Sequence, residues 1–463
     1  MAQSLPKRLA FVYSLGQLGW SMQLTLVTFW LTYVFVPTDL SGIPVYIPQI
    51  AIFGFLTIIG IISLAGRLVD AVTDPWIATL SDRSSHPKGR RISFMRRSAI
   101  PAGIVAALLF ISPVNGTSAW NVLALTVSLF AYYLFYTMYV TPYFSLIAEL
   151  GHTTEEKLNL STYISLTWFL GYALTTQAAA VFPLFESMGM TRIGSMRLTF
   201  VLIAIISTVL MLLPALIIDE KKYSEAQPST APMIESLKAI LSNRWFRPFI
   251  ISDFLYWFGL TIWQTGTLYY VTVLLLRSEQ DAANLVVFSG VLSFALYALI
   301  NLIAKKIGKK QLMLIGYISF IVSFLLTAGL GILPISSTAQ YFILIPLFGL
   351  SLAIFGILPN AIIADVAEFD ARRTGIFREG MFFGARTFVQ KLGVGLGLLV
   401  FNSLLLLGNS STNSLGIRLT AVFAAAIMSI SLIIFIRYRE REVLAAETRE
   451  NPAVQLSGEN DLS

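Results

Sequence analysis

Acidic and basic side chains lie inside apolar stretches of this chain, at a spacing that could hold a cation. The segment GRLVDAVTDP contains Arg67, Asp70 and Asp74. Intervals of three and four residues place these side chains along one face of a helix. Two carboxylates one turn apart repel each other unless a cation lies between them or one of them holds a proton. Asp70 and Asp74 therefore predict a metal site for Na+, or an exchangeable proton, to which Thr73 could add a hydroxyl. The alternative is a structural pair of Arg67 and Asp70, with Asp74 at the membrane interface.

A later apolar stretch, GARTFVQKLGVGLG, contains Arg386 and Lys391. Small residues around Lys391 allow close helix approach. If Lys391 faces the two acids, it competes with the cation for them, which ties cation release to conformation. Arg386 is a second candidate for such a charge pair. The alternative is a permanent salt bridge that locks a closed state. Asp253, in RPFIISDFLYWFG, could pair with Arg247 or reach interfacial water.

The amino-acid composition indicates that membrane-spanning helices carry these residues. Of 463 residues, 56% are hydrophobic and 12% are charged, about half of the roughly 25% charged residues typical of soluble domains. Apolar stretches of about 20 residues, long enough to cross a bilayer, recur along the chain and predict an all-α membrane protein. The twelve predicted spans are 9–36, 48–80, 98–114, 119–148, 158–184, 197–218, 246–275, 284–304, 311–333, 340–366, 379–407 and 417–437.

Several function classes are excluded by the same counts. The net charge of +7 comes from short basic clusters between apolar stretches, so we expect no nucleic-acid partner. The chain has no cysteine, which excludes disulfides and thiolate metal sites. No paired nucleophile and base, metal-ligand cluster or phosphate-binding glycine loop occurs in the sequence. We therefore expect no enzyme activity and no cofactor, and consider a non-transporting receptor or membrane enzyme only a remote alternative.

Lysine and arginine gather in alternate connections, which predicts cytoplasmic N- and C-termini in a multi-pass protein of the inner (plasma) membrane. The side predicted to be outside carries few basic residues: Arg192, Arg197, Arg277 and Arg418. The predicted organisation is an N-terminal six-helix half (1–218), a cytoplasmic linker (219–245), a C-terminal six-helix half (246–437) and a disordered cytoplasmic tail (438–463).

An internal repeat relates the two halves. A basic loop, LSDRSSHPKGRR, follows the second span, and AKKIGKKQ follows the eighth. Span 4 ends on Glu149, and span 10 ends on Asp365. These charges predict a cytoplasmic gate that bridges helices when the inner side closes, although a plain positive-inside loop is an alternative. The predicted gate residues are Asp82, Arg83, Arg90, Glu149, Asp365 and Arg378.

The segment GRLVDAVTDPWIATLSDR, followed by KGRR, resembles the second-helix motif of the glycoside-pentoside-hexuronide:cation symporters, the melibiose-carrier type. The segment Ile362 to Gly393 resembles the same family from the end of helix 10 into helix 11. This resemblance implies a major facilitator fold of twelve helices in two halves related by pseudo-two-fold symmetry, with alternating access driven by Na+, Li+ or H+. It also implies residue roles: Asp70 and Asp74 as cation ligands, Thr73 in place of a frequent Asn, Thr137 as the helix 4 hydroxyl ligand, and Lys391 as the helix 11 lysine.

The residues that bind the sugar in this family are not matched in this chain. Galactoside carriers of the family grip sugar hydroxyls with Asp on helix 1, Asp on helix 4 and Arg on helix 5. The nearest positions here are Ser21, Val140 and Ile164. Small or apolar residues there favour a less polar ligand than melibiose. Candidate substrate residues are Ser21, Tyr143, Phe144, Trp168, Trp263 and Gln264, although aromatic residues also serve as packing or interfacial anchors.

The function expected from these features is a symporter that moves a sugar or glycoside-like small molecule with a coupling ion, Na+ or H+, across the membrane. The partners expected are this small molecule, the monovalent cation and the lipid bilayer, and the chain is expected to be monomeric. A carrier of a lysolipid or another amphiphile on the same fold is the alternative, favoured by the apolar residues Val140 and Ile164.

Overall fold

The structure is a computed structural model, and it describes residues 3–224, 243–375 and 379–448. The predicted gate residue Arg378 lies outside this part of the chain. Within it the chain forms twelve long helices: α1 (Lys7–Thr25), α3 (Ile58–Asp82), α4 (Arg90–Leu108), α5 (Ala119–Leu150), α6 (Thr154–Thr176), α8 (Arg192–Ile217), α11 (Arg247–Tyr269), α12 (Glu279–Ile307), α13 (Lys309–Ala328), α14 (Ser337–Thr374), α15 (Glu379–Leu404) and α16 (Leu415–Phe435).

Eight of these helices are long and apolar enough to cross a membrane by length and composition. The other four are α1, α3, α4 and α11. Two of them carry several charges: α3 contains Arg67, Asp70 and Asp74, and α4 begins with RRISFMRR. Charges in a membrane helix are costly unless they are paired or face the interior of the bundle. The charges of α3, rather than a lack of apolar residues, therefore set it apart from the eight apolar helices.

Short elements extend or connect the long helices. They are η1 (Leu26–Trp30), α2 (Leu31–Phe35), β1 (Ala51–Ile52), β2 (Leu56–Thr57), η2 (Gln177–Ala180), α7 (Phe182–Ser187), α9 (Glu220–Tyr223), η3 (Tyr270–Leu274), η4 (Leu405–Leu407) and α17 (Glu440–Thr448). The two π-helical segments, η1 and η3, continue the first helix of each half, and the two 3-10 segments, η2 and η4, follow the fifth. This correspondence supports the internal repeat.

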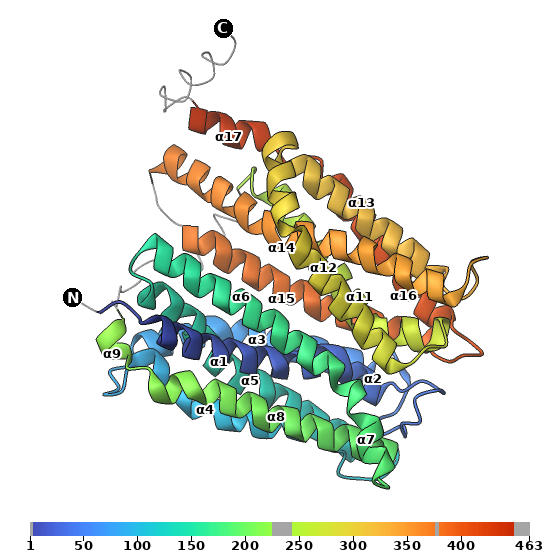
Figure 1. The fold of residues 1–463 in the computed structure, drawn as a ribbon. Helices are drawn as coiled ribbons and strands as arrows, with labels where there is room; N and C mark the ends of the chain where they lie inside the picture. Colours follow the sequence, from blue (N-terminus) through green and yellow to red (C-terminus); the bar gives the residue numbers. More distant parts are fainter. Residues whose placement is uncertain (1–2, 225–242, 376–378, 449–463) are drawn as a thin grey trace.

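Helices α1 to α8 pack mainly on one another, and helices α11 to α16 form the second group. Between the groups, α3 packs against α15, α12 against α6, and α11 against η1. Figure 1 shows the start of α1, the short helix α9 and helix α17 at the same end of the bundle, which we call the termini side. The predicted twelve-helix architecture in two six-helix halves is confirmed.

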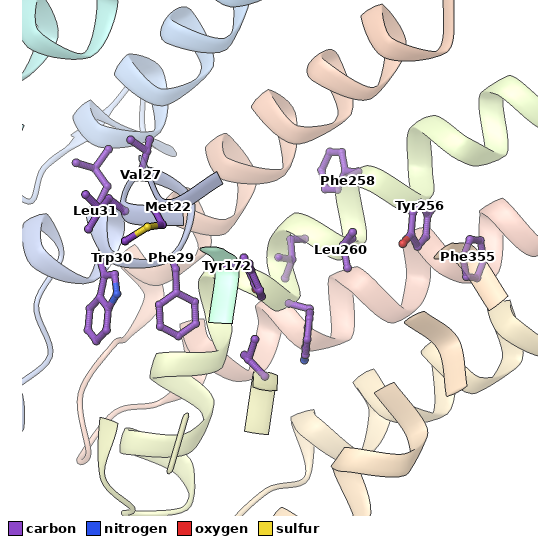
Figure 2. Close-up of a cluster of buried hydrophobic side chains, with 14 of the residues drawn as sticks. Met22, Val27, Phe29, Trp30, Leu31, Tyr172, Tyr256, Phe258, Leu260 and Phe355 are labelled. Carbon is purple, nitrogen blue, oxygen red and sulfur yellow. The ribbon is translucent and has the colours of Figure 1, made fainter. Parts of the chain in front are cut away.

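Apolar side chains fill the region where α1 and η1 approach α11. In Figure 2, Met22 of α1 and Phe29 and Trp30 of η1 belong to the N-terminal half, and Tyr256, Phe258 and Leu260 lie along α11 of the C-terminal half. Tyr256 stacks on Phe355 of α14 with ring centroids 4.1 Å apart. Because η1 also packs against α11, the first helices of the two halves are in contact.

The repeat extends to the way in which the third helix of each half begins. Gly89 (φ 105°) precedes α4, whose first N–H groups donate to the Glu220 carboxylate. Gly308 (φ 90°) precedes α13, whose first N–H groups donate to Glu440. Unpaired N–H groups at a helix start favour a carboxylate. The segment after each half's last span therefore caps the third helix of that half.

Replacing Gly89 with Ala is expected to destabilise the protein by about 1–3 kcal/mol, because this backbone conformation is open mainly to glycine. An added Cβ would also lie 2.6 Å from Glu220 Cβ and would disturb the cap. Gly116→Ala is the matched control, since Gly116 also has positive φ (81°) but nothing within 4 Å of an added Cβ. Thermal unfolding of the purified variants should show a larger loss for Gly89→Ala, and equal losses would contradict the capping role.

Some predicted boundaries differ from the structure. The predicted span 48–80 begins early, because residues 51–57 form a hairpin at Phe53 and Gly54, both with positive φ, before α3 starts at Ile58. The predicted span 340–366 is too short, because α14 continues to Thr374, where charged residues carry it beyond the apolar stretch. The predicted disordered tail is wrong over residues 440–448, which form α17.

Two contacts hold α17 against the rest of the protein. Val443 packs into the core, and Glu442 accepts a hydrogen bond from the Trp245 indole at 3.1 Å. Of the predicted linker, residues 219–224 and 243–245 are described, and they include α9. The rest of the linker and residues 449–463 lie outside the described part of the chain.

Candidate functional site

Three helices position the predicted cation site. Helix α3 carries Asp70 and Asp74, α5 carries two threonines one turn apart, and α15 carries Lys391. Helices α3 and α15 lie very close, because a Cβ at Gly395 would meet Leu64 Cδ1 at 2.9 Å and Arg67 Cβ at 3.2 Å. The glycines after Lys391 therefore allow a helix of the C-terminal half to lie against the acids of the N-terminal half, as the small residues predicted.

The Lys391 ammonium group lies between the two carboxylates. Its Nζ is 2.8 Å from Asp70 Oδ1 and 2.6 Å from Asp74 Oδ2. Thr137 donates to Asp70 Oδ1 at 2.7 Å, and Thr141 donates to Asp74 Oδ1 at 3.0 Å. The Asp70 side chain is 1% exposed, whereas that of Asp74 is 29% exposed. A cation could reach Asp74 from water, while Asp70 lies behind it.

Arg67 completes the charge balance of the site. Its Nη1 lies 3.5 Å from Asp70 Oδ2, and its guanidinium lies 4.9 Å from the centre of the Tyr133 ring. Two basic and two acidic side chains thus compensate each other within one cluster, as a low-dielectric environment demands. Asp70 Oδ2 is buried and accepts no hydrogen bond from the described residues.

The structure brings together Asp70, Asp74, Thr137 and Lys391 but turns Thr73 away. The Thr73 hydroxyl donates to the backbone carbonyls of Val69 and Asp70, at 2.8 and 3.3 Å, within its own helix. Sequence reasoning missed Thr141, which lies beside Asp74. A signal was present, since Thr137 and Thr141 repeat the four-residue interval of Asp70 and Asp74 on a neighbouring helix.

Arg386 lies away from this cluster. Its Nε and Nη2 donate to the Asp253 carboxylate of α11, at 2.9 and 3.1 Å, and its Nη1 donates to Asn360 of α14 at 2.7 Å. Asp253 pairs with Arg386 rather than with Arg247. The spacing on α15 explains the separation, because residues 386 and 391 are five apart and point roughly 140° from each other around a helix.

The predicted substrate residues fall into two groups. Ser21, Tyr143 and Trp263 are packed inside the bundle, each no more than 2% exposed, so they present no free face to a ligand in this conformation. Tyr143 stacks on Tyr13 and donates to its backbone carbonyl. Side chains that remain partly accessible are Phe144, Trp168 and Gln264.

The predicted gate residues form ion pairs within each half. In the first half, Asp82 pairs with Arg91, and Glu149 accepts from Arg90 at 2.8 Å and Arg91 at 3.3 Å. In the second half, Lys309 lies 2.6 Å from Asp365. Burial raises the pKa of the nearby Glu220 carboxyl, and the backbone N–H groups that it accepts lower it. Arg83 is exposed.

Polar contacts between the halves gather at the end of the bundle opposite the termini side. Glu279 of α12 accepts a hydrogen bond from Tyr33 at 2.9 Å and pairs with Arg192. The Tyr269 hydroxyl donates to the carbonyls of Thr32 and Val36, at 3.2 and 2.7 Å. Further contacts of this kind are Gln177 with Asn284 and Gln280, Asn409 with Pro37, and Ser411 with Asp39. Nearer the termini side, among the described residues, Lys391 makes the polar contacts between the halves.

Comparison with known proteins shows the family of this chain. The profile of the family described as MFS/sugar transport protein matches residues 12–436. The chain belongs to this family. The isoprimeverose transporter of Lactiplantibacillus pentosus is 25% identical over 87% of this chain and 81% of its own length. The inner membrane symporter YicJ of Escherichia coli is 25% identical over 88% of this chain and 86% of its own length.

Solved structures agree on the fold. The nucleoside transporter NupG superposes with a TM-score of 0.65 at 14% identity, covering 93% of this chain and 99% of that one. The MFS/sugar transport protein described here is therefore an integral plasma-membrane transporter and not an enzyme. The resemblance to the glycoside-pentoside-hexuronide:cation symporters is confirmed.

Proposed function

We propose that this transporter is a cation-coupled symporter of a glycoside-like solute, with its coupling site at Asp70 and Asp74. The observation that carries the proposal is the Lys391 ammonium group, which lies within 2.8 Å of both carboxylates from the opposite half of the molecule. An ammonium group and a monovalent cation carry the same charge. The two compete for the same oxygen atoms.

This competition provides a mechanism for coupling. When Na+ binds, or a carboxylate takes up H+, Lys391 loses its partners and the link from α15 to α3 breaks. The halves, proposed as residues 1–218 and 246–437 joined by the linker 219–245, are then free to rock around the solute. Without cation or proton, Lys391 pairs with both carboxylates again, and the site is neutral. Coupling arises because the ligand changes the relative free energies of the two conformations.

The distribution of contacts between the halves supports an inward-facing conformation. The basic clusters at the termini side indicate that this side is cytoplasmic. Contacts such as Tyr33 to Glu279 then close the outer side. We propose that the pairs formed by Asp82, Arg90, Glu149 and Asp365 rearrange across the halves when the inner side closes.

Uptake into proteoliposomes tests the proposal. With isoprimeverose, the solute of the relative named above, as the first probe, an inward gradient of Na+ or H+ is expected to raise accumulation several-fold over an equilibrated control. Gradients of the two ions applied separately identify the coupling ion. Accumulation that is indifferent to both gradients contradicts coupling. Binding of lysolipids but of no glycoside would favour the amphiphile alternative.

A further inference from the structure

The C-terminal half contains a second polar cluster, formed by Asp253 of α11, Asn360 of α14 and Arg386 of α15. Asp253 is 2% exposed and Arg386 is 12% exposed, whereas Asn360 is exposed. All the bonds within this cluster join helices of the same half. Rocking of the halves therefore leaves them intact, unlike the bonds of Lys391. This pair is unsuited to coupling and suited to a rigid binding surface.

The cluster retains unused hydrogen-bonding capacity. Three of the five guanidinium N–H donors of Arg386 are used by Asp253 and Asn360. Among the residues that the structure describes, the other two N–H donors of Arg386 and the amide N–H donors of Asn360 have no partner. The carboxylate of Asp253 can accept further bonds, since each oxygen has two lone pairs. Donors and acceptors thus lie side by side with no net charge.

Trp257 adds an aromatic face and an orphan donor to this surface. It lies four residues after Asp253, on the same face of α11. A Cβ at Gly393 of α15 would lie 3.3 Å from Trp257 Cβ, so the indole begins where α11 and α15 are in contact. The Trp257 Nε1 group is buried and has no hydrogen-bond partner among the described residues. A buried N–H without a partner is costly unless a ligand or water supplies an acceptor.

The depth of the cluster fits a solute that is bound together with a cation. Asp253 lies six residues from the start of α11, roughly 9 Å along the helix, and Asp74 lies eight residues from the end of α3, roughly 12 Å. Both distances are measured from the termini side. Helix α15 connects the two clusters, since Lys391 faces the acids and Arg386 faces α11.

We propose that Asp253, Arg386, Asn360 and Trp257 bind the hydroxyl groups of a neutral glycoside. This inference rests on the proposed function and assigns the polar contacts of the solute to the C-terminal half, where Ser21, Val140 and Ile164 of the N-terminal half offer no charged group. A hydroxyl group needs both a donor and an acceptor, which the Arg–carboxylate pair and the amide supply together. The zero net charge favours neutral glycosides over anionic ones.

Calorimetric binding to the purified transporter in nanodiscs tests the assignment, with isoprimeverose and raffinose as neutral probes and a glucuronide as the anionic probe. Asn360→Ala is expected to weaken neutral glycoside binding about tenfold, and Trp257→Phe about threefold. The double variant Asp253→Asn with Arg386→Gln removes both charges, so that no buried charge is left unpaired. It is expected to weaken binding about a hundredfold. Asn402→Ala, on the same helix as Arg386 but bonded to Leu398, is the control.

The outcomes separate this inference from the proposed function. If the unmodified protein binds no neutral glycoside, both are overturned. If it binds one and the variants bind it equally well, or if it prefers the glucuronide, the assignment fails while symport stands. The change in melting temperature caused by the coupling cation should be the same in all variants, because Asp70 and Asp74 are untouched. A purely structural ion pair would lower melting temperatures without a selective loss of glycoside affinity.

Discussion

Replacing Asp70 with Asn is expected to reduce cation-driven accumulation of the solute by a factor of about 100 or more. The carboxylate accepts from Thr137 and Lys391 and is 1% exposed, so no water can substitute for it. Asn keeps the shape but removes the negative charge that we propose binds the cation. Interactions with a charged partner contribute about 1.5–3 kcal/mol each, and two of them correspond to at least a hundredfold change.

Asp74→Asn should have a smaller effect on accumulation, because Asp74 is 29% exposed and water can fill part of its role. Asp281→Asn is the matched control, since Asp281 forms an ion pair with Arg277 far from the site. Uptake driven by Na+ and H+ gradients, measured beside solute counterflow, separates loss of coupling from loss of transport. Cation-dependent accumulation at the level of the unmodified protein in both Asp70→Asn and Asp74→Asn would disprove the coupling site.

The sequence predicts the fold well because lipid imposes strong constraints. Every span must satisfy its own backbone, so runs of apolar residues mark helices with little ambiguity. The predicted helix boundaries are wrong where the chain is not subject to this constraint. The hairpin at Phe53 continues an apolar run without being helical, and α14 extends beyond its apolar run through charged residues. Helix α17 is ordered by contacts with Trp245, which is distant in sequence and leaves no periodic signal.

The candidate site is predictable in part for the same reason. Asp70, Asp74 and Lys391 stand out because charges are rare in apolar helices, and their partners must lie nearby. Thr137 came from the family resemblance, whereas Thr141 and Asn360 are ordinary polar residues whose role depends on which helices meet. Their closeness in sequence did not show that Arg386 and Lys391 have different acidic partners. The structure separates them because they point to different sides of α15.

Replacing Lys391 with Gln is expected to separate exchange from net uptake. The variant leaves Asp70 and Asp74 without the ammonium group that lies 2.8 and 2.6 Å from them. The cation then meets no competitor, and its apparent affinity should rise about tenfold, which corresponds to about 1.4 kcal/mol. The empty carrier carries uncompensated charge and returns slowly, so net uptake should fall about tenfold or more. Exchange of labelled for unlabelled solute does not require the empty carrier to return and should continue.

Two further variants complete this experiment. Lys391→Arg keeps the positive charge and should retain part of the net uptake, with a cation affinity closer to that of the unmodified protein. Lys305→Gln removes an exposed lysine at the end of α12 and should change neither rate. Equal losses of net uptake and exchange in Lys391→Gln, with an unchanged cation affinity, would identify Lys391 as a structural link between α15 and α3. A rise in cation affinity with exchange preserved requires that the ammonium group and the cation compete for the same carboxylates.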